Sequence, residues 1–228
     1  MAALSPPENY VEEAADLLER LGPLAPGPRT LLELGSGGDV SPASETALQP
    51  DAHGSLPGML AVNRRSTLNP SISSGTCEAC AWSASSMSSS YTMRSYATDA
   101  ASVLATLQTA AIHCRPGGVV VASSSTCTGN IHASTDEGGY DGLDGRGFRT
   151  WSGVGIPIPP DDTYIVDYAF LLREASGQCG PHTIGNIEGL FARARWLEWF
   201  AAAGLSVLSN DIDQWGRDVF LARAAGAP

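Results

Sequence analysis

Residues 31–38 read LLELGSGG, and this stretch decides how the chain folds. Its first half is a short apolar run of the kind that forms a buried strand, and its second half is rich in glycine, which permits a tight turn. A strand that ends in such a turn brings backbone N–H groups close to a ligand. We therefore expect a ligand-binding turn here, with a glycine turn that holds no ligand as the simpler alternative.

Helix and strand signals lie on both sides of this turn. Apolar residues at helical spacing predict helices over residues 10–21, 98–114 and 188–205. Short apolar or β-branched runs predict strands over residues 30–34, 119–121, 163–172 and 219–222. Helices that alternate with short buried strands are typical of a parallel α/β sheet. We expect the last two of these strands to form an antiparallel pair.

The composition argues against several classes of protein. A formal net charge of −11, with 13 Lys and Arg residues, argues against a nucleic-acid partner. The chain has no apolar run of about 18 residues and no basic, apolar leader, so we expect neither a membrane span nor a signal peptide. Five cysteines without a disulfide framework favour a reducing compartment. These features predict a cytoplasmic, enzyme-sized protein.

One interpretation of the glycine-rich turn is a dinucleotide-binding loop. That fingerprint places glycine at its first, third and sixth positions. Gly35 and Gly37 fit the first two, but the sixth position is Val40. An NAD-dependent oxidoreductase is therefore the weaker alternative.

The same residues resemble motif I of the class I S-adenosylmethionine-dependent methyltransferases, in which the pattern E/D-x-G-x-G-x-G follows the first strand. The last glycine of that pattern would fall at Asp39, one residue beyond Gly38, so the match is incomplete. The resemblance implies S-adenosylmethionine as the cofactor. It also implies a Rossmann-like methyltransferase fold, with a mostly parallel seven-stranded sheet and helices on both faces.

The resemblance further implies a set of cofactor-binding residues. Glu33 would support the loop, and the backbone around the glycines would pack against the methionine part and the ribose of the cofactor. The residues of that loop are Gly35, Ser36, Gly37 and Gly38. Met59 would follow the ribose-binding position, Gly75 would belong to the turn beside the adenine, and Tyr10 would precede a helix that closes over the cofactor. The catalytic residues are left open.

We expect one domain over residues 1–228. Residues 1–29 would form an amino-terminal helical lid, residues 30–122 the cofactor-binding half, and residues 123–228 a substrate-side half that ends in antiparallel strands. In related enzymes the region after the fifth strand often builds the substrate side. Residues 136–142 would form an acidic, glycine-rich loop there, and a plain solvated loop is an equal alternative.

The pattern Glu188-Gly189-Leu190-Phe191 resembles methyltransferases that act on nucleotide-linked amino sugars. An amine of a small molecule, such as an amino sugar, is therefore the favoured methyl acceptor. The alternative from a different class is a methyltransferase-like interaction module that binds no cofactor.

Other chemistry-bearing side chains are interpreted as structural. Cys77 and Cys80 form a C-x-x-C without a second pair at ligand spacing, so we expect no metal site. His113 lies at the expected end of a helix, where the helix dipole favours a cation. The expected core aromatic residues are Trp196, Trp199 and Phe200.

Residues 71–90 contain nine serines at the place where the fold needs its central strand. Back-translated with GC-rich codons and read one base out of register, residues 75–95 give GDMRSVRLVREFDVVFIHDAV, which supplies an acidic turn and a buried strand. We hypothesise that the chain is a mosaic of two reading frames, with shifted segments near residues 40–57, 75–95, 123–130, 155–160 and 178–186. Without such shifts, the interaction module becomes the leading hypothesis, ahead of the enzyme.

Overall fold

The structure is a computed structural model that describes residues 11–24, 29–34, 48–54, 71–74, 89–94, 99–114, 117–124, 127, 133–155 and 162–224. The chain divides into two compact units. Unit 1 comprises residues 1–95, 101–125 and 193–228, and unit 2 comprises residues 96–100 and 126–192. This division differs from the predicted halves, because unit 2 interrupts unit 1 instead of following it.

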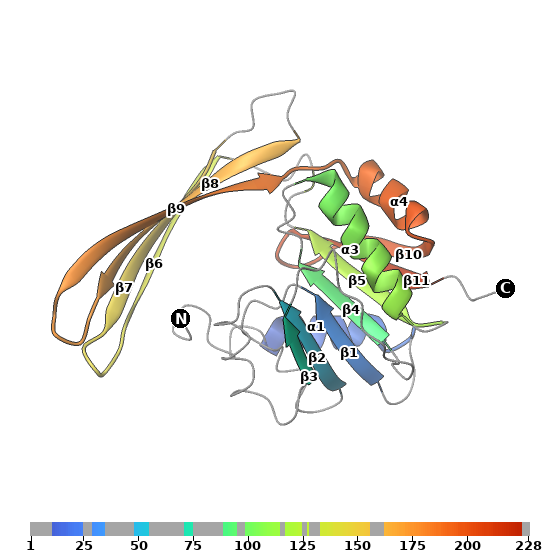
Figure 1. Cartoon of the computed structure of the whole chain (residues 1–228), viewed down its shortest axis with the longest axis horizontal. Coiled ribbons are helices and arrows are strands. Elements are labelled where there is room, and N and C mark those ends of the chain that lie inside the picture. Colours follow the sequence, from blue (N-terminus) through green and yellow to red (C-terminus); the bar gives the residue numbers. More distant parts are fainter. Residues whose placement is uncertain are drawn as a thin grey trace. The chain divides into compact units, whose positions relative to one another are not determined.

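A sheet of seven strands forms the centre of unit 1 (Figure 1). In chain order its strands are β1 (Arg29–Leu34), β2 (Leu48–Gly54), β3 (Ser71–Ser74), β4 (Ser89–Arg94), β5 (Val119–Ser124), β10 (Leu205–Ile212) and β11 (Asp218–Ala224). Their order across the sheet is β10-β11-β5-β4-β1-β2-β3. Neighbouring strands are parallel from β3 through β2, β1 and β4 to β5. By contrast, β11 is antiparallel to both of its neighbours, β5 and β10.

Helices cover both faces of this sheet. On one face, α1 (Val11–Leu21) packs Leu17 and Leu21 against apolar side chains of β5 and β11; these are Val119, Val121, Val219 and Leu221. Phe220 points to the opposite face, because successive side chains of a strand alternate. There α4 (Arg193–Ala202) packs Trp196 and Phe200 against it, with ring centroids 5.5 and 5.4 Å from that of Phe220.

The third helix, α3 (Ala100–His113), lies beside α4 (Figure 1). Its buried side chains include Val103 and Leu107. With both faces covered, β5 is buried along its whole length, and its apolar run VVVA is typical of a strand buried on two sides. None of the helices in the described residues is long and apolar enough to cross a membrane.

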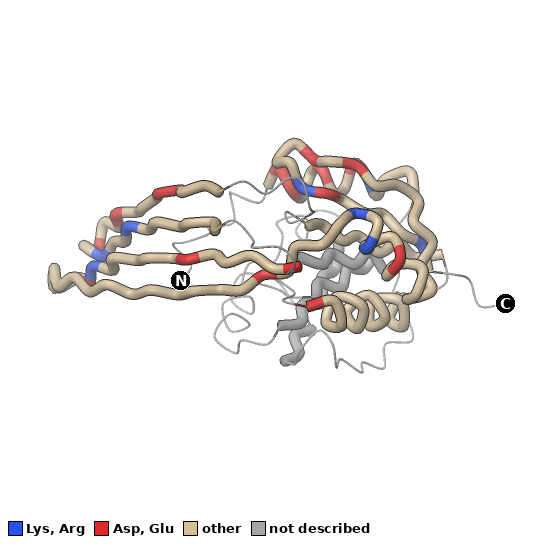
Figure 2. The backbone as a smooth tube through the Cα atoms, turned by 90° about the horizontal axis from the view of Figure 1, so that it is seen from above, with Lys and Arg blue, Asp and Glu red and all other residues tan. Residues whose placement is uncertain are grey.

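Unit 2 contains a separate antiparallel sheet in the order β6-β7-β8-β9. Its strands are β6 (Ser134–Asp141), β7 (Gly147–Val154), β8 (Thr163–Arg173) and β9 (Cys179–Gly189). A small core of Tyr164, Val166 and Leu190 lies at one end of it, with Val154 and Tyr168 packed alongside. The edge strand β6 is exposed throughout, and acidic and basic residues mix near the turns (Figure 2).

Several sequence-based predictions hold in this fold. Helices form within residues 10–21, 98–114 and 188–205, and strands form over the runs at 30–34, 119–121, 163–172 and 219–222. The three aromatic residues expected in the core are buried: Trp196, Trp199 and Phe200. His113 is the last residue of α3, as expected, and its Nδ1 lies 2.8 Å from the carbonyl oxygen of Thr109.

Other predictions are wrong. The run at 163–172 does not pair with the run at 219–222, because β8 lies between β7 and β9 while β11 lies between β5 and β10. The true partner of β11 escaped notice because β10 reads LSVLSNDI, in which polar residues break the apolar run. The predicted loop at 136–142 is mostly strand β6, despite residues that disfavour strands, since β7 pairs with its whole length. The predicted helix at 188–205 is shorter, because Glu188 belongs to β9 and Leu205 begins β10.

Candidate functional site

The carboxyl ends of the parallel strands meet at one edge of the seven-stranded sheet. Leu34, the last residue of β1, pairs with His53 of β2 on one side and with Met93 of β4 on the other. Arg94 at the end of β4 pairs with Ser123 near the end of β5. We call this edge the carboxyl edge.

The chain changes direction across the sheet between β1 and β4. From β1 it proceeds through β2 to β3 on one side, and then returns to place β4 on the other side of β1. In open α/β sheets, ligands bind in the crevice outside the carboxyl ends of the strands at such a switch point. The strand order therefore places the candidate site at the end of β1.

The predicted site residues can be compared with this location. Glu33 lies in β1, one residue from its end, where it pairs with Ala52 of β2 and Thr92 of β4. Gly35 follows β1 and Gly75 follows β3 directly in the sequence, so the chain leaves both strands at the carboxyl edge. The other predicted residues lie, like these two glycines, outside the described residues: Tyr10, Ser36, Gly37, Gly38 and Met59.

The hairpin that joins β10 to β11 lies at the same edge, since Asp218 at the start of β11 pairs with Ser124 at the end of β5. Asp213 organises its turn. One carboxylate oxygen accepts hydrogen bonds from the backbone N–H groups of Trp215 and Arg217, at 3.0 and 2.9 Å. The turn also uses Gly216 at φ 77°, a backbone conformation that glycine adopts without strain.

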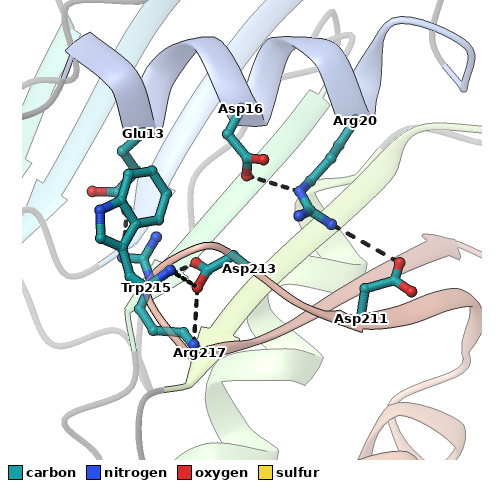
Figure 3. Close-up of polar contacts among 7 residues, drawn as sticks. All are labelled: Glu13, Asp16, Arg20, Asp211, Asp213, Trp215 and Arg217. Carbon is teal, nitrogen blue, oxygen red and sulfur yellow. Dashed lines mark hydrogen bonds and ion pairs between the residues drawn. The ribbon is translucent and has the colours of Figure 1, made fainter.

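Arg217 joins this hairpin to the first turn of α1 (Figure 3). Its Nε donates to Asp213 at 2.6 Å and its Nη1 donates to Glu13 at 2.8 Å. Burial of the guanidinium opposes its charge, but the hydrogen bonds to Asp213 and Glu13 outweigh burial and raise the pKa of Arg217. The start of α1 is therefore fixed at the carboxyl edge.

A buried ion pair lies beside this hairpin. Asp218 is fully buried, and one of its oxygens accepts a hydrogen bond from Nε of Arg193 at 2.6 Å; Nη2 of the same guanidinium also lies 2.6 Å from that oxygen. Arg193 is the first residue of α4 and its side chain is 46% exposed. The pair thus brings a solvent-accessible cation to the carboxyl edge.

Sequence reasoning missed this group of charged residues. The available signal was the stretch DQWGRD over residues 213–218, which has the aspartate and glycine of a tight turn between two strands. Without the polar strand β10 before it, that turn could not be recognised as a hairpin.

The described residues contain two further features. In unit 2, the hydroxyl of Tyr164 donates to the carboxylate of Glu188, and both side chains are buried. In unit 1, a shallow depression lies at the end of the sheet opposite the carboxyl edge, where Arg223 pairs with Val119 at the start of β5. Its lining includes Gln108, Ile112, Gly204 and Ala224. This depression is remote from the switch point, so we do not assign it to the candidate site.

No cluster of three or more His, Cys, Asp or Glu residues that could hold a metal ion occurs within the described part of the chain. Cys77 and Cys80 lie outside it.

No known protein family and no curated protein matches this sequence. Many solved structures, however, share its architecture. DesVI of Streptomyces venezuelae is 19% identical, with a TM-score of 0.82 over 96% of this chain and 92% of that chain. A sugar N-methyltransferase, KedS8 from a Streptoalloteichus species, is 20% identical, with a TM-score of 0.83 over 95% of this chain and 88% of that one.

A third similar structure is CalS10 with bound S-adenosylmethionine, an amino pentose methyltransferase of Micromonospora echinaspora involved in calicheamicin biosynthesis. It is 20% identical, with a TM-score of 0.79 over 95% of this chain and 92% of that chain. At these identities the likeness shows the fold. This chain therefore has the Rossmann-like fold of the S-adenosylmethionine-dependent methyltransferases.

Proposed function

We propose that this chain is an S-adenosylmethionine-dependent methyltransferase that acts on an amine of a small molecule, with amino sugars as the favoured acceptors. The observation that carries the proposal is the position of the glycine-rich stretch. It follows β1 directly, at the point where the strand order reverses. The choice of acceptor is supported by two structural neighbours, an amino pentose methyltransferase and a sugar N-methyltransferase.

The local architecture fits this cofactor. β1 and β4 are adjacent and parallel, with Leu34 opposite Met93 at their carboxyl ends. The glycines from Gly35 onward would let the backbone come close to the ligand, and Glu33 would support the loop. S-adenosylmethionine, when bound, supplies a methyl group already activated by its sulfonium. The chain then has to align the acceptor and exclude water.

Calorimetry of the full chain with S-adenosylhomocysteine and with NAD tests the cofactor. We expect heat of binding with S-adenosylhomocysteine and none with NAD. Glu33→Ala should weaken binding by more than about tenfold, since each charge-assisted hydrogen bond contributes roughly 1.5–3 kcal/mol. Glu198→Ala is the matched control, because Glu198 lies on the exposed side of α4, where it pairs with Arg195 at 2.8 Å.

The outcomes separate the three functional hypotheses. Absence of heat with S-adenosylhomocysteine at high micromolar concentration would exclude the enzyme and favour the interaction module. Binding of NAD alone would favour the oxidoreductase. If S-adenosylhomocysteine binds, incubation with methyl-labelled S-adenosylmethionine and a panel of nucleotide-linked amino sugars identifies the acceptor. Label on a hydroxyl-only sugar, and on no amine, would contradict the proposed amine acceptor.

We place this reaction in the cytoplasm. The basis is the odd number of cysteines, five in all, and the three cysteines in the described residues form no disulfide. Fractionation of the producing cell checks this placement, and recovery of the protein outside the cytoplasmic fraction would contradict it.

A further inference from the structure

Arg217 is held in a single geometry by three neighbours (Figure 3). Its Nη1 donates to Glu13 and its Nε donates to Asp213, while its guanidinium lies 4.8 Å from the centre of the Trp215 ring. The planar guanidinium suits such divided contacts, which a lysine ammonium cannot reproduce together. The side chain is 19% exposed, so these contacts are only partly screened by water.

The turn that presents Arg217 is itself fixed. The Asp213 side chain is fully buried and accepts two backbone hydrogen bonds in addition to that from Arg217. The backbone N–H of Asp213 donates to the carbonyl of Arg217, which closes the turn. Arg217 therefore has little conformational freedom to lose when it binds Glu13.

The direction of α1 places the contact between Arg217 and Glu13 at the start of the helix. Glu13 lies in the first turn of α1 and contacts the hairpin at the carboxyl edge. At the other end, the carbonyl of Leu24 accepts a hydrogen bond from Arg223, which pairs with Val119 at the opposite edge of the sheet. The chain therefore enters α1 at the edge where β1 ends and leaves it at the far edge.

We propose that Arg217 is a positioning residue for cofactor binding, because it fixes the first turn of α1 at the carboxyl edge, the edge of the sheet at which β1 ends. This proposal rests on the proposed function. A helix start that is already fixed loses less conformational freedom when the ligand binds, and such preorganisation raises affinity without any direct contact.

A second ion pair on the same helix provides the control. Arg20 contacts Asp16 at 2.8 Å and Asp211 of β10 at 3.9 Å, and its side chain is 21% exposed, close to the value for Arg217. It lies seven residues beyond Glu13, about 10 Å along the helix. Arg20→Met thus removes a longer, more exposed attachment of α1 to β10 at a distance from the carboxyl edge.

The test is calorimetric titration of the full chain with S-adenosylhomocysteine, together with thermal unfolding of each variant. Arg217→Met should raise the dissociation constant by about tenfold, a typical size for coupling between sites. Arg217→Lys should recover part of this loss, because the charge is retained. Arg20→Met should leave the dissociation constant within about twofold, and it should lower the melting temperature less than Arg217→Met does.

The outcomes distinguish the positioning role of Arg217 from the proposed function. Equal weakening by Arg217→Met and Arg20→Met, or unchanged binding in Arg217→Met, would overturn the positioning role and leave the proposed function intact. Failure of the unsubstituted chain to bind would overturn both. Should Arg217→Met not fold, Glu13→Gln decides, since it removes the charge on α1 and leaves the turn at Asp213 untouched. Unchanged binding in folded Glu13→Gln would then exclude the role.

Discussion

Arg193 and Asp218 form an ion pair whose two members are in very different surroundings. The carboxylate is fully buried, whereas the guanidinium is about half exposed. Removal of the cation leaves a buried carboxylate without its arginine, which costs more than removal of a carboxylate whose partner can turn to water. Arg193→Met should therefore lower the free energy of unfolding by about 3 kcal/mol, and Asp218→Asn by about half as much.

Urea denaturation measures both losses. Arg195→Met serves as the control, because Arg195 lies on the same helix in an exposed pair with Glu198. Its effect should stay within about 0.5 kcal/mol. Equal losses from Arg193→Met and Arg195→Met would show that the buried carboxylate does not depend on its cation.

Asp141 is a second residue whose charge depends on its partners. A hydrogen bond from Arg149 above all, helped by Arg173, holds its pKa below the ordinary value. Because the pKa of Asp141 is lower in the folded chain than in the unfolded chain, the carboxylate stabilises the fold at pH values above its ordinary pKa of about 3.9. This stabilisation is lost as the pH falls through the lowered pKa. Carboxyl titration by NMR should show Arg149→Met raising the pKa of Asp141 more than Arg173→Met does. The reverse order would assign the main role to Arg173.

At the scale of elements, α1 depends on a few apolar contacts. Leu21 is fully buried against β5 and β11. Leu21→Ala should cost about 2–5 kcal/mol, the usual range for a leucine removed from a core. Leu197→Ala, at a side chain that is 40% exposed on α4, should cost less than about 1 kcal/mol. Equal costs, measured by urea unfolding, would mean that α1 is not docked on the sheet.

The elements also show how far the sequence could predict this molecule. Strands such as β5 and β11 were predictable because continuous apolar runs are typical of strands buried on both faces. Strands β6, β9 and β10 were not, because glycine, proline and acidic residues disfavour strands and only pairing overrides that preference.

The position of the candidate site along the chain was predictable in part, because Glu33 and the glycines after it stand out locally, at the end of an apolar run. The ion pairs of Arg193 with Asp218 and of Arg217 with Glu13 join residues far apart in the chain. The order of the strands in the sheet determines which of these residues meet, and no local sequence pattern reveals that order.

At the scale of the whole molecule, burial predicts where the backbone opens most readily. β5 is buried at every residue, whereas β6 is exposed at every residue and lies at the edge of its sheet. Opening free energies are lowest where buried contacts are few. Hydrogen exchange followed by mass spectrometry should show peptides over residues 134–141 exchanging much faster than peptides over residues 119–124. Similar rates would contradict this order of local stability.

The hypothesis of two reading frames also belongs to the whole chain, and it stays a prediction. As given, the sequence has no Lys or Arg between Arg65 and Arg94, so trypsin should release one serine-rich peptide over residues 66–94. The shifted frame instead predicts a peptide that begins EFDVVFIHDAV. A tryptic map of the purified protein distinguishes the two, and recovery of the serine-rich peptide would exclude the frame shift.

The longer segment of unit 2, residues 126–192, is an insertion between segments of unit 1, and its two ends lie together, since Cys127 and Phe191 form a parallel β-bridge. Ser124 and Asp218 therefore pair across a long stretch of chain that contains this insertion. The entropy of loop closure rises by only about 0.6 kcal/mol for each doubling of loop length. Evolution can thus lengthen, shorten or exchange this insertion with little effect on the stability of the seven-stranded sheet.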